Sequence, residues 1–392
     1  MSKIKIIKNK NRDLIEKKCL KEIIYMLPGI KKHQIKSSQI LDYGKTPVIS
    51  QEKEIISGYY NDLDPIHANS ESPIIIFGDH SCTLKLIDFD FVLGGDGTKV
   101  FKSKNKEDTL FLYYCIKNIG LNTEGYKRHF SILKDKEILD ISNKKKVCNI
   151  LKKQESVISN IEKLILKTEK LFDYFKDELL SGRKIIDFKN MEVNLINSSN
   201  KINLRTVKLN DIIAFSMGNT PKKIDDNYNG DIPWITISNL KSKYINNYTA
   251  FVKNSKSIKI IPKDTLIGSF KMSVGRFGFT TEDCCTNEAI IAIRKEDTKE
   301  NLDYLYYLLP KYFNDNAEKN GQGIPLLNSK KIKDIMVDIP KLEDQNKIVD
   351  FLKKYENLIE NQKKLLEKEK QKFKWLSEKL LSGEYLVVEE QE

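Results

Sequence analysis

The segment NKIVDFLKKYENLIENQKKLLEKEKQKFKWLSEKLLSG, residues 346–383, decides the fold of this 392-residue chain. Its apolar residues lie mostly three or four positions apart, which predicts a helix with a narrow apolar stripe on a charged surface. At 1.5 Å per residue this helix is about 55 Å long, and the Ser-Gly after its last leucines is a typical stop signal. Such a helix needs a partner for its stripe. The stripe consists of Ile348, Leu352, Tyr355, Ile359, Leu366, Phe373, Leu376 and Leu380.

A second segment, KKVCNILKKQESVISNIEKLILKTEKLFDYFKDELLSG at residues 145–182, repeats the first without a gap at an offset of 201 positions. Both segments end in Leu-Leu-Ser-Gly. The simplest cover for each apolar stripe within one polypeptide is the other helix, packed antiparallel. Matching positions include Leu151 with Leu352, Ile158 with Ile359, Leu164 with Leu365 and Phe172 with Phe373.

A block of alternating apolar and polar residues with many turn signals precedes each helix, which predicts strands. Each block opens with Gly-x-Thr-Pro, at Gly44 and Gly218, and has an apolar strand pair in its middle. Each then has a short tyrosine-rich helix, which contains Tyr113-Tyr114 in one block and Tyr306-Tyr307 in the other. The chain therefore reads as a duplication of strand block and long helix.

This order predicts an α+β fold with a pseudo-two-fold repeat, in which two strand-rich domains are separated by an antiparallel coiled coil. Two similar heads on a rod give a dumbbell, which suits a negatively charged partner with a regular repeat, such as duplex DNA. The predicted parts are an N-terminal extension at 1–34, a first head at 35–143, a first spacer helix at 144–182, a second head at 205–343 and a second spacer helix at 344–383.

The charge agrees with a polyanionic partner but does not prove one. Lys and Arg number 67 against 55 Asp and Glu, a net charge of +12, yet lysine-rich chains can be basic without binding nucleic acid. Six cysteines without a C-x-x-C pair and four histidines without ligand spacing predict reduced thiols and no metal site. No apolar run of about 18 residues and no signal-peptide pattern occur, so we expect a cytoplasmic protein.

The sequence FVLGGDGTKVF, residues 91–101, allows two interpretations. Its GGDGT core is similar to the glycine-rich signature with which NAD kinases and diacylglycerol kinases hold phosphates, but it also suits a tight hairpin turn between two strands. A kinase needs a helix directly after the glycines, whereas KSKNKEDT follows here. We therefore interpret Gly94, Gly95 and Gly97 as a turn. No P-loop, dinucleotide fingerprint or Asn/Asp-Pro-Pro-Tyr/Phe element occurs, so we expect no catalytic residue and no cofactor site in this chain.

The chain resembles, over nearly its full length, the specificity subunit of type I restriction–modification enzymes. The resemblance is carried by KLNDIIAFSMGNTPKKIDDNYNGDIPWITISNLKS at 208–242 and GQGIPLLNSKKIKDIMVDIPKLEDQNKIVDFL at 321–352, where Asp344 replaces the commoner glutamate of a Pro-x-x-Glu-Gln helix entry. It implies that each head is a target recognition domain for one half of a split DNA site. It also implies that the spacer docks two methyltransferase subunits, which carry S-adenosylmethionine, and that nuclease and translocase reside on another chain.

Two alternatives stay open at this point. The chain could serve another restriction system or an orphan methyltransferase, which the sequence cannot separate from the first interpretation. It could also be a coiled-coil scaffold with basic heads that binds DNA without sequence preference.

Base reading needs donors and acceptors on loops or strands that can enter a groove, with Arg and Lys suited to guanine and Asn and Gln to adenine. Arg128 and Arg276 are the best candidates, because arginine is scarce here and both lie outside charged helices. Trp234 is expected in the core. The predicted contacts of the first head are Lys45, Thr46, His80, Lys85, Lys99, Lys127, Arg128 and His129. Those of the second head are Asn219, Thr220, Lys222, Lys223, Lys271, Arg276 and Gln322.

Overall fold

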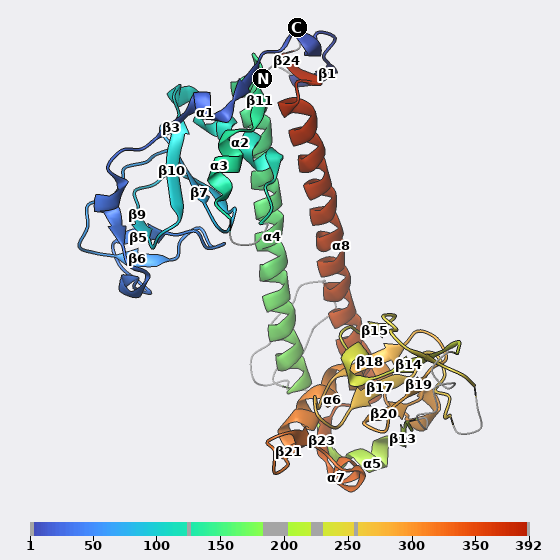
Figure 1. Ribbon diagram of the computed structural model, residues 1–392. Coiled ribbons are helices and arrows are strands. Elements are labelled where there is room, and N and C mark those ends of the chain that lie inside the picture. Colours follow the sequence, from blue (N-terminus) through green and yellow to red (C-terminus); the bar gives the residue numbers. More distant parts are fainter. Residues whose placement is uncertain (1–3, 124–126, 183–202, 221–229, 255–257, 390–392) are drawn as a thin grey trace. The chain divides into compact units, whose positions relative to one another are not determined.

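The computed structural model describes residues 4–123, 127–182, 203–220, 230–254 and 258–389. The chain divides into two compact units, one of Met1–Leu164 with Gln362–Glu392 and the other of Ile165–Asn361. The division crosses both predicted spacer helices, α4 (Lys144–Leu180) and α8 (Leu342–Leu381), which form as expected. Each unit therefore contains one strand-rich head and part of each long helix (Figure 1).

The head of the first unit contains two four-stranded sheets. One is antiparallel, in the order β3-β10-β7-β8, and the other has the order β4-β9-β5-β6, with β9 parallel to both β4 and β5. Buried Phe77 and Phe101 of the first sheet pack on helices, whereas Leu93 lies in a cluster shared by both sheets. The strands are β3 (Ile24–Met26), β4 (Gln34–Ile35), β5 (Thr46–Ile49), β6 (Gly58–Tyr60), β7 (Ile74–Gly78), β8 (Leu84–Ile87), β9 (Val92–Gly94) and β10 (Thr98–Ser103).

The head of the second unit repeats this topology. Its larger sheet has the order β13-β20-β17-β18-β15, so its first four strands correspond to β3-β10-β7-β8, and β16-β14-β19 corresponds to β6-β5-β9 with the same parallel and antiparallel pairings. The predicted pseudo-two-fold repeat is therefore confirmed, and Trp234 is buried as expected. The strands are β13 (Ser216–Met217), β14 (Ile232–Ile235), β15 (Tyr244–Ile245), β16 (Phe251–Val252), β17 (Leu266–Ser269), β18 (Phe277–Thr280), β19 (Cys285–Thr286) and β20 (Ile290–Ile293).

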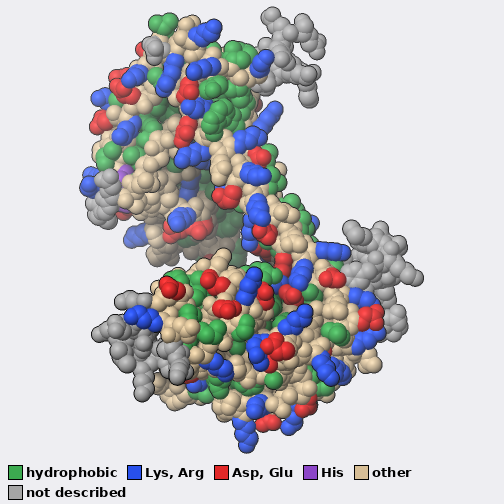
Figure 2. All heavy atoms as spheres, turned by 90° about the vertical axis from the view of Figure 1, so that its right-hand side faces the viewer, with side chains coloured by type: hydrophobic (Ala, Val, Ile, Leu, Met, Phe, Trp, Pro, Cys, Tyr) green, Lys and Arg blue, Asp and Glu red, His purple; other side chains and the backbone are tan. Residues whose placement is uncertain are grey.

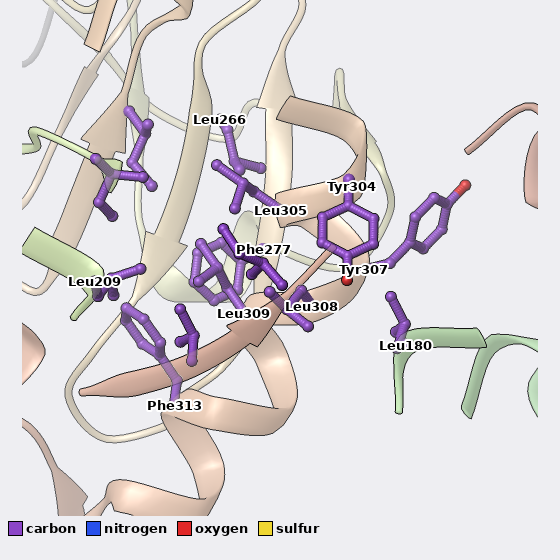
Figure 3. Packing of buried hydrophobic residues seen from close by; sticks show 14 of the residues in the cluster. Leu180, Leu209, Leu266, Phe277, Tyr304, Leu305, Tyr307, Leu308, Leu309 and Phe313 are labelled. Atoms are coloured by element: carbon purple, nitrogen blue, oxygen red, sulfur yellow. The ribbon is translucent and has the colours of Figure 1, made fainter. Parts of the chain in front are cut away.

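Both heads also share their helices and a short outer strand pair. The tyrosine-rich helices are α2 (Thr109–Ile119) and α6 (Leu302–Asn316), followed by α3 (His129–Lys134) and α7 (Ser329–Asp334). Figure 3 shows how Tyr304, Leu305 and Leu309 of α6 pack with Leu266 and Phe277 of the sheet, and how Leu180 of α4 joins the same cluster. The outer pairs are β2 (Lys17–Cys19) with β11 (Glu137–Leu139), and β12 (Arg205–Lys208) with β23 (Met336–Ile339).

The predicted N-terminal extension, residues 1–34, contributes to the first unit. β2, α1 (Leu20–Ile23) and β3 repeat the order of β12, α5 (Leu209–Ile212) and β13, and β1 (Ile4–Lys8) pairs antiparallel with β24 (Tyr385–Glu389). Strand β3 hydrogen-bonds to β10, so part of the predicted extension belongs to the main sheet of the head. The predicted domain boundaries remain predictions, because the two compact units meet within the long helices.

Two local predictions are wrong. The two Gly-x-Thr-Pro sequences are not equivalent, since the one at Gly44 leads into β5 whereas the one at Gly218 follows β13. Glycine and proline mark turns in general rather than one particular turn. Gly95 and Gly97 of GGDGT do form a turn, with φ of 72° and 89°, but Gly94 is the last residue of β9, and the turn joins strands of different sheets and is not a hairpin. Strand β10 directly follows the turn, where a phosphate-binding kinase loop would lead into a helix.

The long helices pack antiparallel within each unit, which confirms the predicted coiled coil. In the first unit Leu151 of α4 packs with Leu376 and Leu380 of α8, and the ion pair between Glu162 and Lys370 measures 3.0 Å. In the second unit the rings of Phe175 and Phe351 lie 5.3 Å apart, edge to face. Later residues of α4 thus meet earlier residues of α8, as the matched stripes require.

Candidate nucleic-acid interface

Loops of the second head bring several predicted contacts together. The segment between β17 and β18 carries exposed Lys271 and Arg276. It rests on the hairpin of β21 (Glu318–Lys319) and β22 (Pro325–Leu326), because the Met272 N–H donates to the Pro325 carbonyl at 2.9 Å. Gln322 is exposed in the turn of this hairpin. Side chains that can donate to guanine or to phosphate therefore lie on adjoining loops.

Glu288, in the turn between β19 and β20, adds an acceptor to these loops. The Thr220 hydroxyl donates to its carboxylate. This hydrogen bond, together with the charge of Lys271, lowers the pKa of Glu288, so it is ionised at neutral pH. Thr220 and Lys271 thus lie near one carboxylate, and the three side chains offer both donors and an acceptor.

Corresponding loops of the first head are held by the same backbone contact. The N–H of Asp79 donates to the Gly97 carbonyl at 2.7 Å, and the N–H of Phe270 donates to the Ala289 carbonyl at 3.0 Å. This contact aligns the residues of the two heads. By this alignment His80 corresponds to Lys271, and Asp96 corresponds to Glu288. The Asp96 carboxylate likewise accepts a hydrogen bond, from the Gln34 amide at 2.9 Å.

Three predicted contacts of the first head are corrected by their burial. Lys85 is 5% exposed, and its ammonium donates to the carbonyls of Ser50 at 2.9 Å and Glu54. His129 is 1% exposed, with its Nδ1 3.0 Å from the Asp79 carbonyl. Thr46 is buried at the start of β5. Lys85 and His129 thus satisfy internal polar groups, and none of the three side chains is accessible to a DNA groove.

The other candidates of the first head lie near the surface. Lys99 of β10 is half-buried and its ammonium is 3.5 Å from the carboxylate of buried Asp79. His80, the residue after Asp79, is half-buried. Lys45 is exposed, with its N–H donating to Asn61 at 2.8 Å, and exposed Lys127 and Arg128 precede α3.

The remaining candidates of the second head cannot all be placed. Lys222 and Lys223 lie outside the described residues. Asn219 is half-buried, and its side-chain oxygen accepts from the Lys259 N–H at 3.1 Å. No candidate is yet assigned to a base or a phosphate, so all the accessible ones stay predictions.

Sequence reasoning missed two features of the second head. Met272 is 64% exposed and has a φ of 64°, a left-handed conformation that costs about 1–2 kcal/mol for a residue with a side chain. Glu288 was missed because an acidic residue in a basic chain does not suggest DNA contact. No sequence motif next to Met272 or Glu288 identifies either residue as part of a candidate DNA-binding surface.

Charge is dispersed on the visible surface. Figure 2 shows Lys and Arg side chains interspersed with Asp and Glu over one face, without a single basic patch. Within the described residues, no group of His, Cys, Asp and Glu is suited to hold a metal ion, and no helix is long and apolar enough to cross a membrane. Buried Cys148, Cys284 and Cys285 have their thiol pKa raised to about 12 by desolvation, which makes them unreactive at neutral pH.

Comparisons with known proteins agree with this architecture. The family model described as the type I restriction modification DNA specificity domain matches residues 201–369. The EcoR124I/EcoR124II specificity subunit of Escherichia coli is 25% identical over an alignment of 360 residues that covers 83% of this chain and 83% of that protein. The MjaIX specificity subunit of Methanocaldococcus jannaschii is 32% identical over an alignment of 170 residues that covers 40% of this chain and 39% of that protein.

Two solved structures share the fold. The S subunit of a type I restriction–modification system from M. genitalium matches with a TM-score of 0.58 and 19% identity, over 95% of this chain and 97% of that one. A chain from a study of complex assembly and conformational transition of the type I system matches with a TM-score of 0.55 and 13% identity, over 94% and 98%. Residues 201–369 therefore match a type I restriction modification DNA specificity domain, and over most of its length the chain is similar to specificity subunits of type I restriction enzymes.

Proposed function

We propose that each head binds one half of a split DNA target and that the chain itself catalyses no reaction. One observation carries this proposal: the two heads have the same scaffold but different side chains at corresponding loop positions. His80 stands where the other head has Lys271, and Asp96 stands where it has Glu288. Two heads with the same scaffold but different loop side chains can each recognise a different DNA sequence, because the loop side chains supply the contacts to the bases.

We also propose that the long helices dock two methyltransferase subunits, which carry the S-adenosylmethionine, and that restriction and translocase subunits join the same complex. Exposed apolar side chains recur on α4 and α8 at the 201-residue offset, and each is between 43% and 49% exposed. Two equivalent apolar surfaces suit two copies of one partner. The pairs are Val157 with Leu358, Leu164 with Leu365, and Tyr174 with Trp375.

Because the proposed binding target is the DNA of the host cell, we expect the subunit to act in the cytoplasm. Its partners there are double-stranded DNA and protein subunits. No membrane partner is proposed.

A head exchange tests the proposed recognition. Residues 17–139, from β2 to β11, are replaced by the corresponding block of another specificity subunit, and the methylated target is determined with the methyltransferase partner. One half of the target should change while the other half stays intact, because each head is a separate folded block. If both halves changed together, recognition would not be divided between the heads.

A further inference from the structure

A tyrosine of the short helix contacts a glutamate of the long helix in the first unit. The Tyr114 hydroxyl of α2 donates to the Glu155 carboxylate of α4 at 2.6 Å. The Lys117 ammonium also donates to this carboxylate and lies 5.3 Å from the ring centroid of Phe373 in α8. One carboxylate therefore binds the head to the long helices through two directional, charge-assisted contacts.

The second unit contains the corresponding cluster. The Lys243 ammonium joins Tyr307 of α6 to Glu356 of α8, because it donates to both the Tyr307 hydroxyl and the Glu356 carboxylate at 2.9 Å. Lys243 also lies 3.2 Å from the carboxylate of Asp303 and 4.8 Å from the Tyr307 ring centroid. Its side chain is only 12% exposed. Since Lys243 directly precedes β15, it connects the sheet of the head to both α6 and α8.

The two clusters are equivalent although their lysines are not. Glu155 and Glu356 are separated by the 201-residue offset of the long helices, and Tyr114 and Tyr307 occupy matching places in the tyrosine-rich helices. The cation comes from α2 in one unit and from the loop before β15 in the other. In both units a tyrosine of the short helix is thus linked to a glutamate of a long helix, directly in the first unit and through Lys243 in the second.

This pair differs in kind from the other contacts between head and helix. Apolar packing, such as that of Phe172 and Phe175 with the core of the second unit, constrains the orientation of a head less than a hydrogen bond does. A hydrogen bond weakens steeply when its angle changes, and one to a charged group is stronger than one between neutral groups. The pair can therefore fix an orientation that packing alone leaves adjustable.

We propose that Tyr114 with Glu155 and Tyr307 with Glu356 are positioning residues, which fix the angle of each head on the long helices and so determine how strictly the protein selects the gap between two half-sites. This inference rests on the proposed recognition of a split target. It assigns these residues no contact with bases.

The test uses the full chain with its methyltransferase partner and a DNA library in which fixed half-sites are separated by gaps of every length. Tyr307→Phe should reduce the preference for the native gap over gaps one base pair longer or shorter by about tenfold, the size of one hydrogen bond to a charged group. The sequence of each half-site should stay unchanged. Tyr114→Phe should act in the same way through the other head, and provides the test if Tyr307→Phe does not fold.

Tyr312→Phe is the matched control. The Tyr312 hydroxyl accepts a hydrogen bond from the Asp338 N–H at 3.0 Å, within the head, so its loss should lower thermal stability similarly without changing gap selection. The proposal is overturned if Tyr114→Phe and Tyr307→Phe both select gaps as strictly as the wild type. It is also overturned if Tyr312→Phe reduces gap selection as much as they do. A wild-type protein that prefers no split site would instead refute the proposed function, and with it the positioning role of these tyrosines and glutamates.

Discussion

Replacement of Lys85 by methionine should destabilise the first head by about 2–4 kcal/mol and should not remove a DNA contact. The Lys85 ammonium donates to the carbonyls of Ser50 at 2.9 Å, Glu54, and Ile55 at 3.5 Å, all in the segment between β5 and β6. Methionine fills a similar volume but leaves these carbonyls without their donor. A buried polar group that loses its partner costs about 1–3 kcal/mol, and the removal of a desolvated charge offsets part of the total.

The magnitude can be measured by native-state hydrogen exchange, which reports on one head of a multi-unit chain. A loss of 2–4 kcal/mol lowers the protection of amides in β5 and β8 by roughly 30- to 1,000-fold. Lys45→Met is the control, because this exposed lysine should change protection by less than about 0.5 kcal/mol. The reasoning fails if Lys85→Met keeps wild-type protection while DNA affinity falls.

Three further predictions concern the whole chain. DNA affinity should fall on the order of 10⁴-fold between 50 and 200 mM salt if about eight phosphates are neutralised, and a flat salt response would exclude DNA as the main partner. One heptad added to each long helix, after Leu166 and after Glu367, adds about 10 Å and should lengthen the preferred gap by roughly three base pairs; an unchanged gap would show that the helices do not set it. Raising the pH from 9 to 11 should lower the free energy of unfolding, because the thiols of Cys148, Cys284 and Cys285, with pKa near 12 when folded, ionise only in the unfolded chain. Each thiol contributes at most about 1.4 kcal/mol per pH unit, so Cys285→Ala should flatten this slope, and an unaltered slope would contradict the assignment.

The long helices and the duplication were predictable because both produce repeated patterns of apolar residues in the sequence. The stripe from Ile348 to Leu380 has helical periodicity, and the 201-residue offset identifies its partner without any structural information. The strand blocks were recognisable for the same reason. Their apolar hairpins, β7 with β8 and β17 with β18, form in equivalent places of the two sheets.

The start of the first head could not be predicted, since its strands are too short to show a period. β2 and β3 have three residues each and are fixed by pairing with β11 and β10, more than 70 positions away in the sequence. The glycine turn after β9 was recognised as a turn, but only tertiary pairing reveals that it joins two sheets.

The candidate site was predictable only in part, because a polar side chain in a strand can face either solvent or an internal group. Lys85 reads as a surface cation, yet it binds carbonyls about 30 positions away in the sequence. His129 is similar, as its partner Asp79 lies 50 positions away. The exposure of Lys271, Arg276 and Gln322 was predictable because loops with glycine and polar residues usually lie at the surface.

The central claim, that this chain directs methylation to a split DNA target, is tested most directly by sequencing the methylated bases of the host genome with and without its gene. The account predicts one two-part motif with a fixed gap that is methylated in the wild type and unmethylated in the deletion strain. Restoring the gene with an exchanged first head should restore methylation at a motif that differs in one half. An identical set of methylated motifs in the wild type and the deletion strain would contradict the account.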